Sequence, residues 1–229
     1  MGQVHERVAD LFFPRRCIGC GKYGYFLCDL CLLKLPRLLP PFCRKCGRSE
    51  SGGSLCPTCW GWRSDIDGIR SCFHFDGIIR RAVYELKYHG LKSISGSLAE
   101  LMADYLQNDF PPCEVLVPVP LHPKRLRQRG YNQSEILSRK LGELTGLPMD
   151  GDCLIRLKDS LPQARSKTVE ERRRNVDSAF TCRDGRFTGK RVILVDDVCT
   201  SGSTLETCAE ALKAAGAASV WGLTLARES

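Results

Sequence analysis

Short apolar runs alternate with segments of helical periodicity from about residue 68 to the end of the chain. Continuous apolar stretches predict strands, whereas apolar residues spaced three and four apart predict helices. This alternation is typical of βαβ units in an α/β protein with a parallel sheet, whose ligands bind at the carboxyl ends of the strands. The predicted strands are 69–75, 115–119, 191–195 and 219–226, and the predicted helices are 78–89, 98–106, 133–144 and 205–215.

The first 64 residues differ from the rest in composition. They hold paired cysteines, prolines and glycines, and they begin with a short predicted amphipathic helix that has Val4, Val8, Leu11 and Phe12 on one face. A short cysteine-rich segment interrupted by proline and glycine cannot build a large core, so metal ions must take the place of one. We therefore predict a small cysteine-rich domain at 1–64 and an α/β domain at 65–229.

Eight of the 14 cysteines form four Cys-x-x-Cys pairs before Trp60. Two such pairs can complete one tetrahedral Cys₄ site, so the eight thiols suit two structural Zn²⁺ ions. A disulfide framework is the alternative, although the rest of the chain is typical of a cytosolic enzyme. Sequential pairing of the motifs is favoured over interleaved pairing because the connections within each set are short. The sequential sets are Cys17, Cys20, Cys28 and Cys31, and Cys43, Cys46, Cys56 and Cys59.

An acidic pair, Asp196 and Asp197, directly follows the predicted strand 191–195. A turn of small residues comes next, and then a predicted helix. Loop amides and a helix N-terminus can hold a phosphate, while adjacent carboxylates can accept ribose hydroxyls and attract Mg²⁺. The pattern therefore suits a sugar phosphate, although the same residues could simply cap the helix. The turn residues are Thr200, Ser201, Gly202, Ser203 and Thr204.

Two basic segments accompany this motif. His122, Lys124 and Arg125 follow the predicted strand 115–119, which places them near the same crevice unless they only begin a solvated helix. The second segment, 163–175, is a flexible loop or a charged surface helix. Its residues of interest are Arg165, Ser166 and Lys167.

The formal net charge of +8 favours phosphate-rich partners without choosing among them. No apolar stretch is long enough to span a membrane, and no secretory signal is present at the N-terminus, so the sequence predicts a cytoplasmic protein.

The acidic pair and its loop resemble the signature of type I phosphoribosyltransferases, which bind phosphoribosyl pyrophosphate (PRPP). The resemblance implies that Asp196 and Asp197 contact the ribose and that residues 200–204 hold the 5′-phosphate. It also implies that the loop after strand 115–119 binds pyrophosphate and that the segment around Arg165 closes over PRPP. Purine-salvage members carry an acid where this chain has Thr200, which makes a purine acceptor less expected.

Taken with the cysteine pairs, five further motifs make nearly the whole chain similar to the bacterial ComF family. They are Pro-Val-Pro-Leu-His-Pro, Arg-Gly-Tyr-Asn-Gln, Gln-Ala-Arg-Ser, Glu-Arg-Arg-Arg-Asn and Val-Asp-Asp-Val. The resemblance implies a role in natural competence, with single-stranded DNA and DNA-uptake proteins as partners. Two hypotheses follow: a transferase using PRPP and Mg²⁺, with no catalytic base identified, or a zinc-dependent nucleic-acid or partner-binding module whose pocket senses PRPP.

Overall fold

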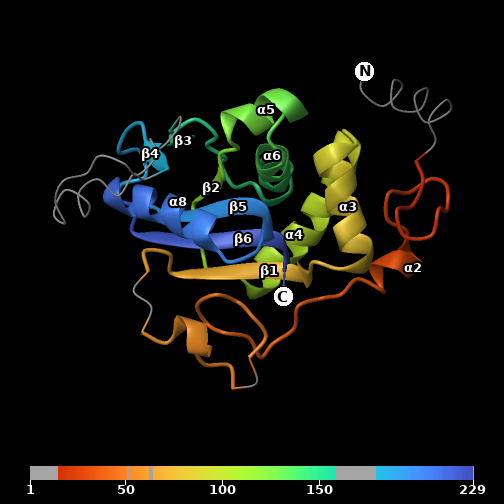
Figure 1. Ribbon diagram of the computed structural model, residues 1–229, viewed down its shortest axis with the longest axis horizontal. Helices are drawn as coiled ribbons and strands as arrows, with labels where there is room; N and C mark the ends of the chain where they lie inside the picture. The colour runs from red at the N-terminus through yellow and green to blue at the C-terminus, as the bar shows by residue number, and fades with distance from the viewer. Residues whose placement is uncertain (1–14, 51, 62–63, 158–178, 229) are drawn as a thin grey trace, which may run out of the picture.

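Four parallel strands form the central sheet of the computed structural model, which describes residues 15–50, 52–61, 64–157 and 179–228 (Figure 1). Their cores are buried on both faces, which explains the nearly continuous apolar runs in the sequence. The predicted α/β class with a parallel sheet is confirmed. The spatial order is β1 (Gly68–His74), β6 (Ser219–Arg227), β5 (Arg191–Cys199) and β2 (Val115–Pro118).

Helices cover both faces of this sheet. Three of them bury their apolar stripes against one face through residues such as Leu86, Leu98 and Leu137, and a fourth covers the other face with Leu205 and Leu212. The first three are α3 (Gly77–Tyr88), α4 (Ser95–Asp109) and α6 (Gln133–Thr145), and the fourth is α8 (Ser203–Ala214).

The smaller elements lie between these or in the cysteine-rich part. They are helices α2 (Asp29–Leu32) and α5 (Pro123–Arg129), turns η1 (Pro57–Cys59) and η2 (Lys92–Ile94), and the antiparallel pair β3 (Leu154–Arg156) and β4 (Phe180–Cys182).

The cysteine-rich part covers the outer edge of β1. Leu38 N–H donates to the Cys72 carbonyl at 3.0 Å, His74 N–H to Pro36 at 2.8 Å and Ile69 N–H to Lys45 at 2.7 Å. These bonds satisfy polar groups that a sheet edge would otherwise leave open. In Figure 1 this part of the chain runs along the β1 side of the sheet.

The structure differs from the sequence predictions mainly near the acidic pair. Strand β5 does not end at Val195 but continues to Cys199, because Asp196 and Val198 still pair with β6. Helix α8 begins at Ser203, two residues before the predicted start. Periodicity did not reveal α5, β3 or β4, which are too short for a clear pattern.

Two sequence predictions concern residues outside the described ranges. They are the amphipathic helix around Val4 and the loop with Arg165, Ser166 and Lys167. Within the described residues, no helix combines the length and the apolarity needed to cross a bilayer.

Candidate functional site

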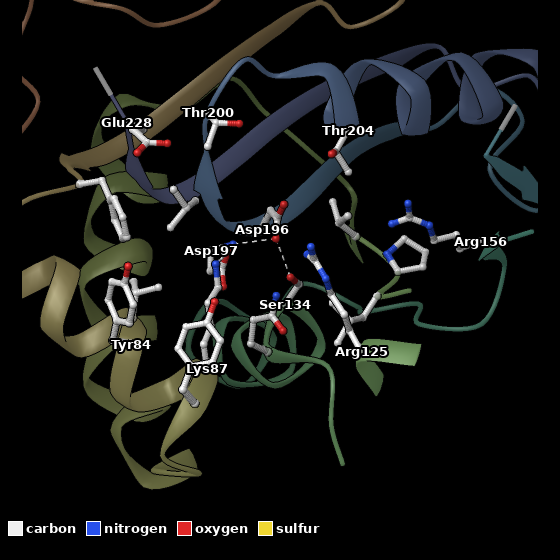
Figure 2. A pocket seen from close by; sticks show the side chains of 18 residues that line it. Tyr84, Lys87, Arg125, Ser134, Arg156, Asp196, Asp197, Thr200, Thr204 and Glu228 are labelled. Carbon is white, nitrogen blue, oxygen red and sulfur yellow. Dashed lines mark hydrogen bonds and ion pairs between the residues drawn. The ribbon is translucent and has the colours of Figure 1, made fainter. Parts of the chain in front are cut away.

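A pocket of about 330 Å³ lies at the carboxyl ends of β5, β2 and β6 (Figure 2). Helix α3, the segment after β2 and the N-terminal ends of α6 and α8 complete its walls. This is the edge at which parallel α/β sheets bind their ligands. The polar or aromatic residues labelled in Figure 2 are Tyr84, Lys87, Arg125, Ser134, Arg156, Asp196, Asp197, Thr200, Thr204 and Glu228.

Each carboxylate of the acidic pair has a partner from a different helix. Ser134 Oγ of α6 donates to Asp196 Oδ1 at 2.8 Å, and Lys87 Nζ of α3 lies 2.9 Å from Asp197 Oδ1. The Asp197 side chain is 3% exposed, and its Oδ2 has no hydrogen-bond partner in the described part of the chain. A buried oxygen without a partner is costly, so Asp197 is well suited to receive a ligand hydroxyl or a cation.

The environment of Asp196 favours its protonated form. Burial, and then repulsion from Asp197, raise the pKa of Asp196 to about 7, although Ser134, the Asp197 amide and Lys87 act in the opposite direction. A cation bound beside the pair would relieve this repulsion and restore the ionised form. Paired carboxylate oxygens are the ligands that Mg²⁺ prefers, so the donor set fits that ion.

The turn after β5 leads directly into α8. Gly202 has a φ of 88°, and a Cβ there would lie 3.0 Å from Ile69 Cδ1, so glycine meets both requirements. The positive end of a 12-residue helix, whose N-cap Gly202 makes no side-chain cap hydrogen bond, favours an anion here. Thr200 and Thr204 line the pocket, whereas Ser201, Gly202 and Ser203 form the turn beside it.

The structure separates the three basic residues after β2. Arg125 lines the pocket, but His122 and Lys124 are outside its lining. His122 instead caps α5, where its Nδ1 accepts a hydrogen bond from the Lys124 N–H at 3.1 Å. The segment is therefore a short helix of the kind that the sequence allowed, and the pyrophosphate role of these residues stays a prediction.

Several pocket residues were missed by sequence reasoning. Lys87 and Tyr84 lie on α3, far from the acidic pair in sequence, and Ser134 opens α6. The only available signal was the placement of polar residues on a helix that follows a strand of the sheet. Glu228 and Arg156 complete the polar lining and had no recognisable motif.

The eight paired cysteines form two compact sets, with all sulfur atoms of a set within 4.8 Å of one another. Each set combines two Cys-x-x-Cys motifs that follow one another in the sequence, which is the pairing that the short connections favoured. Each set matches a structural Cys₄ zinc site. The first set is Cys17, Cys20, Cys28 and Cys31, and the second is Cys43, Cys46, Cys56 and Cys59.

The thiols of each set titrate unequally without a metal. Burial raises the pKa of Cys17 and of Cys43, but hydrogen bonds from backbone N–H groups outweigh this effect and lower the pKa of each thiol to about 6. Burial, followed by neighbouring sulfur atoms, raises the pKa of Cys31 to about 12. Four thiolates cannot ionise together unless a cation compensates them, and Zn²⁺ supplies that charge.

Arg227 connects the second cysteine set to the strand ends. Its Nη1 donates to the Cys46 carbonyl at 2.7 Å and lies 3.1 Å from Cys199 Sγ at the end of β5. The side chain is buried, and its Nε and Nη2 have no hydrogen-bond partner among the described residues. A zinc ion with four thiolates carries a net negative charge, which would compensate this buried guanidinium.

Comparison with known protein families finds one match in the cysteine-rich part of the chain and one in the α/β part. Residues 8–62 match the Double zinc ribbon domain family, and residues 129–228 match the Phosphoribosyl transferase domain family. The α/β part is therefore a phosphoribosyltransferase domain, and the two Cys₄ sets belong to a double zinc ribbon.

Relatives align along most of the chain. Competence protein ComFC of Bacillus subtilis is 30% identical, over 88% of this chain and 84% of that protein. Competence protein F of Haemophilus influenzae is 31% identical, over 94% of this chain and 99% of that protein. DNA utilization protein YhgH of Salmonella typhi is 28% identical, over 85% of this chain and 87% of that protein.

Proposed function

This chain belongs to the ComF family of competence proteins, and from that premise we propose that its pocket binds PRPP with Mg²⁺ and that the protein handles single-stranded DNA. The observation that carries the PRPP proposal is the buried acidic pair beside a helix N-terminus. Asp197 Oδ2 lacks a partner among the described residues, and repulsion within the pair favours a cation. The DNA proposal is supported by the names of the relatives and by the net charge of +8.

The pocket offers residues of suitable chemistry for the ribose, the 5′-phosphate and the pyrophosphate of PRPP. Asp196 and Asp197 would accept hydrogen bonds from the ribose hydroxyls, and the turn from Thr200 to Thr204 would bind the 5′-phosphate. Arg125 makes no hydrogen bond or ion pair with the described residues and is free to meet the pyrophosphate. The carboxylates of the acidic pair would hold Mg²⁺, and the bound ion would neutralise part of the negative charge of the pyrophosphate.

Transfer and binding alone are distinct functions for such a pocket. In transfer, a nucleophile forms a bond to the anomeric carbon while the bond to pyrophosphate breaks, and Arg125 stabilises the charge of the departing pyrophosphate. In binding alone, PRPP stays intact and alters how the protein handles DNA. Pyrophosphate release during incubation with PRPP and Mg²⁺, with and without candidate acceptors, decides between the two.

The PRPP proposal predicts the effect of replacing both acids by asparagine. Asp196→Asn with Asp197→Asn retains the size of the side chains but removes the charges that accept the hydroxyls. Each lost charge-assisted hydrogen bond costs about 1.5–3 kcal/mol, so the affinity for PRPP should fall at least about tenfold. Calorimetric titration with PRPP and Mg²⁺ measures this loss, and circular dichroism checks that the fold is retained.

A matched control makes the same change in net charge away from the pocket. Glu100 and Asp152 are exposed and do not line the pocket, so Glu100→Gln with Asp152→Asn should leave PRPP affinity unchanged. Equal affinity in the native protein and the double Asn variant would refute the proposed site, as would an absence of PRPP binding by the native protein.

A further inference from the structure

A second pocket adjoins the candidate PRPP pocket. It has a volume of about 500 Å³ and shares Lys87, Tyr88, Leu121, Arg125 and Gln133 with its neighbour. We call it the basic side pocket. Because the shared residues line both, a ligand in the side pocket would reach the mouth of the PRPP pocket.

The basic side pocket is built for an anion. Lys87, Arg125 and Arg129 line it together with His89, and none of the described residues in its lining is acidic. Lys87 is paired with Asp197, and Arg129 bonds to the neutral Gln133, but Arg125 has no partner among the described residues. His89 is itself paired with Glu85 at 3.0 Å. Among the described residues, Arg125 and Arg129 therefore face this pocket without a carboxylate partner.

Three neighbouring aromatic rings, two of them on α3, extend from one pocket to the other. Phe75 and Tyr84 line the PRPP pocket, and Tyr88 lines both. The ring centroids of Phe75 and Tyr84 are 6.3 Å apart with an interplanar angle of 21°, and those of Tyr84 and Tyr88 are 5.4 Å apart. Tyr84 is 41% exposed and Tyr88 65% exposed, so much of each ring remains open to a ligand.

Cations flank these rings. The guanidinium of Arg129 lies 5.5 Å from the Tyr88 ring centroid, and that of Arg80 lies 5.7 Å from Tyr84. Exposed aromatic rings alternating with cations are the means by which proteins bind single-stranded nucleic acid, since bases stack on the rings and phosphates meet the cations.

We propose that Tyr84, Tyr88, Arg125 and Arg129 form a track for single-stranded nucleic acid that ends at the PRPP pocket. This inference rests on the proposed DNA role and locates it on α3 and α5 rather than on the exposed aromatics of the zinc ribbons, such as Trp60. Because Lys87 and Arg125 line both pockets, the strand and PRPP compete for them.

The test uses fluorescence anisotropy of a labelled oligo(dT) with the full-length protein. Tyr84→Ala with Tyr88→Ala should weaken binding at least about tenfold, because stacking contributes substantially for each base. The matched control, Tyr23→Ala with Tyr25→Ala, removes two exposed rings from the first zinc ribbon and should leave affinity near that of the native protein. Tyr84→Phe with Tyr88→Phe should retain binding, because the rings remain.

Arg125→Gln supplies a readout that altered folding would not imitate. Loss of one phosphate contact should lower the slope of log affinity against log salt by about 0.7 for a single strand. Saturating PRPP with Mg²⁺ should weaken oligo(dT) binding by the native protein, and this effect should vanish in the Asp196→Asn, Asp197→Asn variant.

The outcomes separate the track from the function on which it rests. If the native protein does not bind oligo(dT), both the DNA role and the track are wrong. If the native protein binds and the alanine pair on α3 binds equally well, or the Tyr23, Tyr25 control binds more weakly than that pair, the strand lies elsewhere and only the track is wrong.

Discussion

Adjacent carboxylates at one strand end have unequal surroundings. Asp197 is buried and faces the ammonium of Lys87, whereas Asp196 accepts a hydrogen bond from Ser134 and has its pKa raised to about 7 by burial and by Asp197. The ionised form of Asp196 is thus disfavoured in the ligand-free fold. Ligand binding that needs this carboxylate charged must therefore remove a proton near neutral pH.

We predict that PRPP affinity falls as pH is lowered through 7. At pH 6 only about a tenth of Asp196 would be ionised, so affinity should be about tenfold lower than at pH 8. The stability of the ligand-free protein has the opposite dependence: a carboxyl pKa raised above 3.8 makes the fold lose stability as pH rises from about 4 to about 7. Calorimetry in buffers with different protonation enthalpies measures the proton that is released on binding.

Phosphate groups of PRPP also titrate near pH 6, so Asp196→Asn provides the baseline. The variant should retain only the pH dependence of the ligand itself, at lower affinity. Identical proton release by the variant and the native protein would show that Asp196 is not the titrating group.

At the scale of the elements, the pattern of apolar residues located most of the α/β part. The strands at 69–75 and 219–226 and the helices at 78–89 and 133–144 match β1, β6, α3 and α6 within one residue at each end. These elements are long and deeply buried, so the spacing of their apolar residues shows directly which of them are helices and which are strands. Cysteine spacing was equally informative, because one metal ion fixes the positions of four ligands.

Other features depended on contacts between distant segments. The strand β5 passes through two charged residues because pairing with β6 outweighs the low strand propensity of aspartate. Lys87 meets Asp197 only after α3 packs on the sheet, and His122 leaves the pocket because it caps α5. The local spacing of apolar residues does not predict contacts between residues that are distant in the sequence.

The close contact between the second zinc ribbon and β1 gives a prediction at this scale. Gly47 has a φ of 72°, and a Cβ there would lie 2.4 Å from the Ile69 carbonyl oxygen. Gly47→Ala should therefore incur both the left-handed backbone cost and a steric overlap with β1, lowering the free energy of unfolding by about 2–4 kcal/mol in all. Urea unfolding and the rate of zinc loss to a chelator measure the effect.

Gly21→Ala is the matched control for this substitution. Gly21 has a φ of 78°, but a Cβ there would meet open space, so only the backbone cost of about 1–2 kcal/mol applies. Equal losses in the two variants would mean that the ribbon does not press closely against β1.

At the scale of the whole molecule, the two zinc sites are connected to the α/β part in different ways. The first set packs against Ile78 at the start of α3. The second set reaches the carboxyl end of the sheet through Arg227, which bonds to the Cys46 carbonyl and touches Cys199, the residue before Thr200. Among the described residues, the second site is thus linked through one buried side chain to the residue before the proposed phosphate turn, whereas the first site contacts α3.

We predict that loss of the second zinc ion loosens this turn, whereas loss of the first does not. Cys43→Ser and Cys17→Ser each remove one buried ligand, and zinc analysis should show one ion remaining in each variant. Cys43→Ser should speed hydrogen exchange in residues 196–204 and weaken PRPP binding about 2- to 30-fold, as expected for a coupling of about 0.5–2 kcal/mol. Cys17→Ser should leave exchange and affinity near native values. The sheet should survive both changes, since its core is formed by β1, β2, β5, β6 and their helices. If the two variants alter the turn equally, Arg227 does not transmit the state of the second zinc site to the pocket.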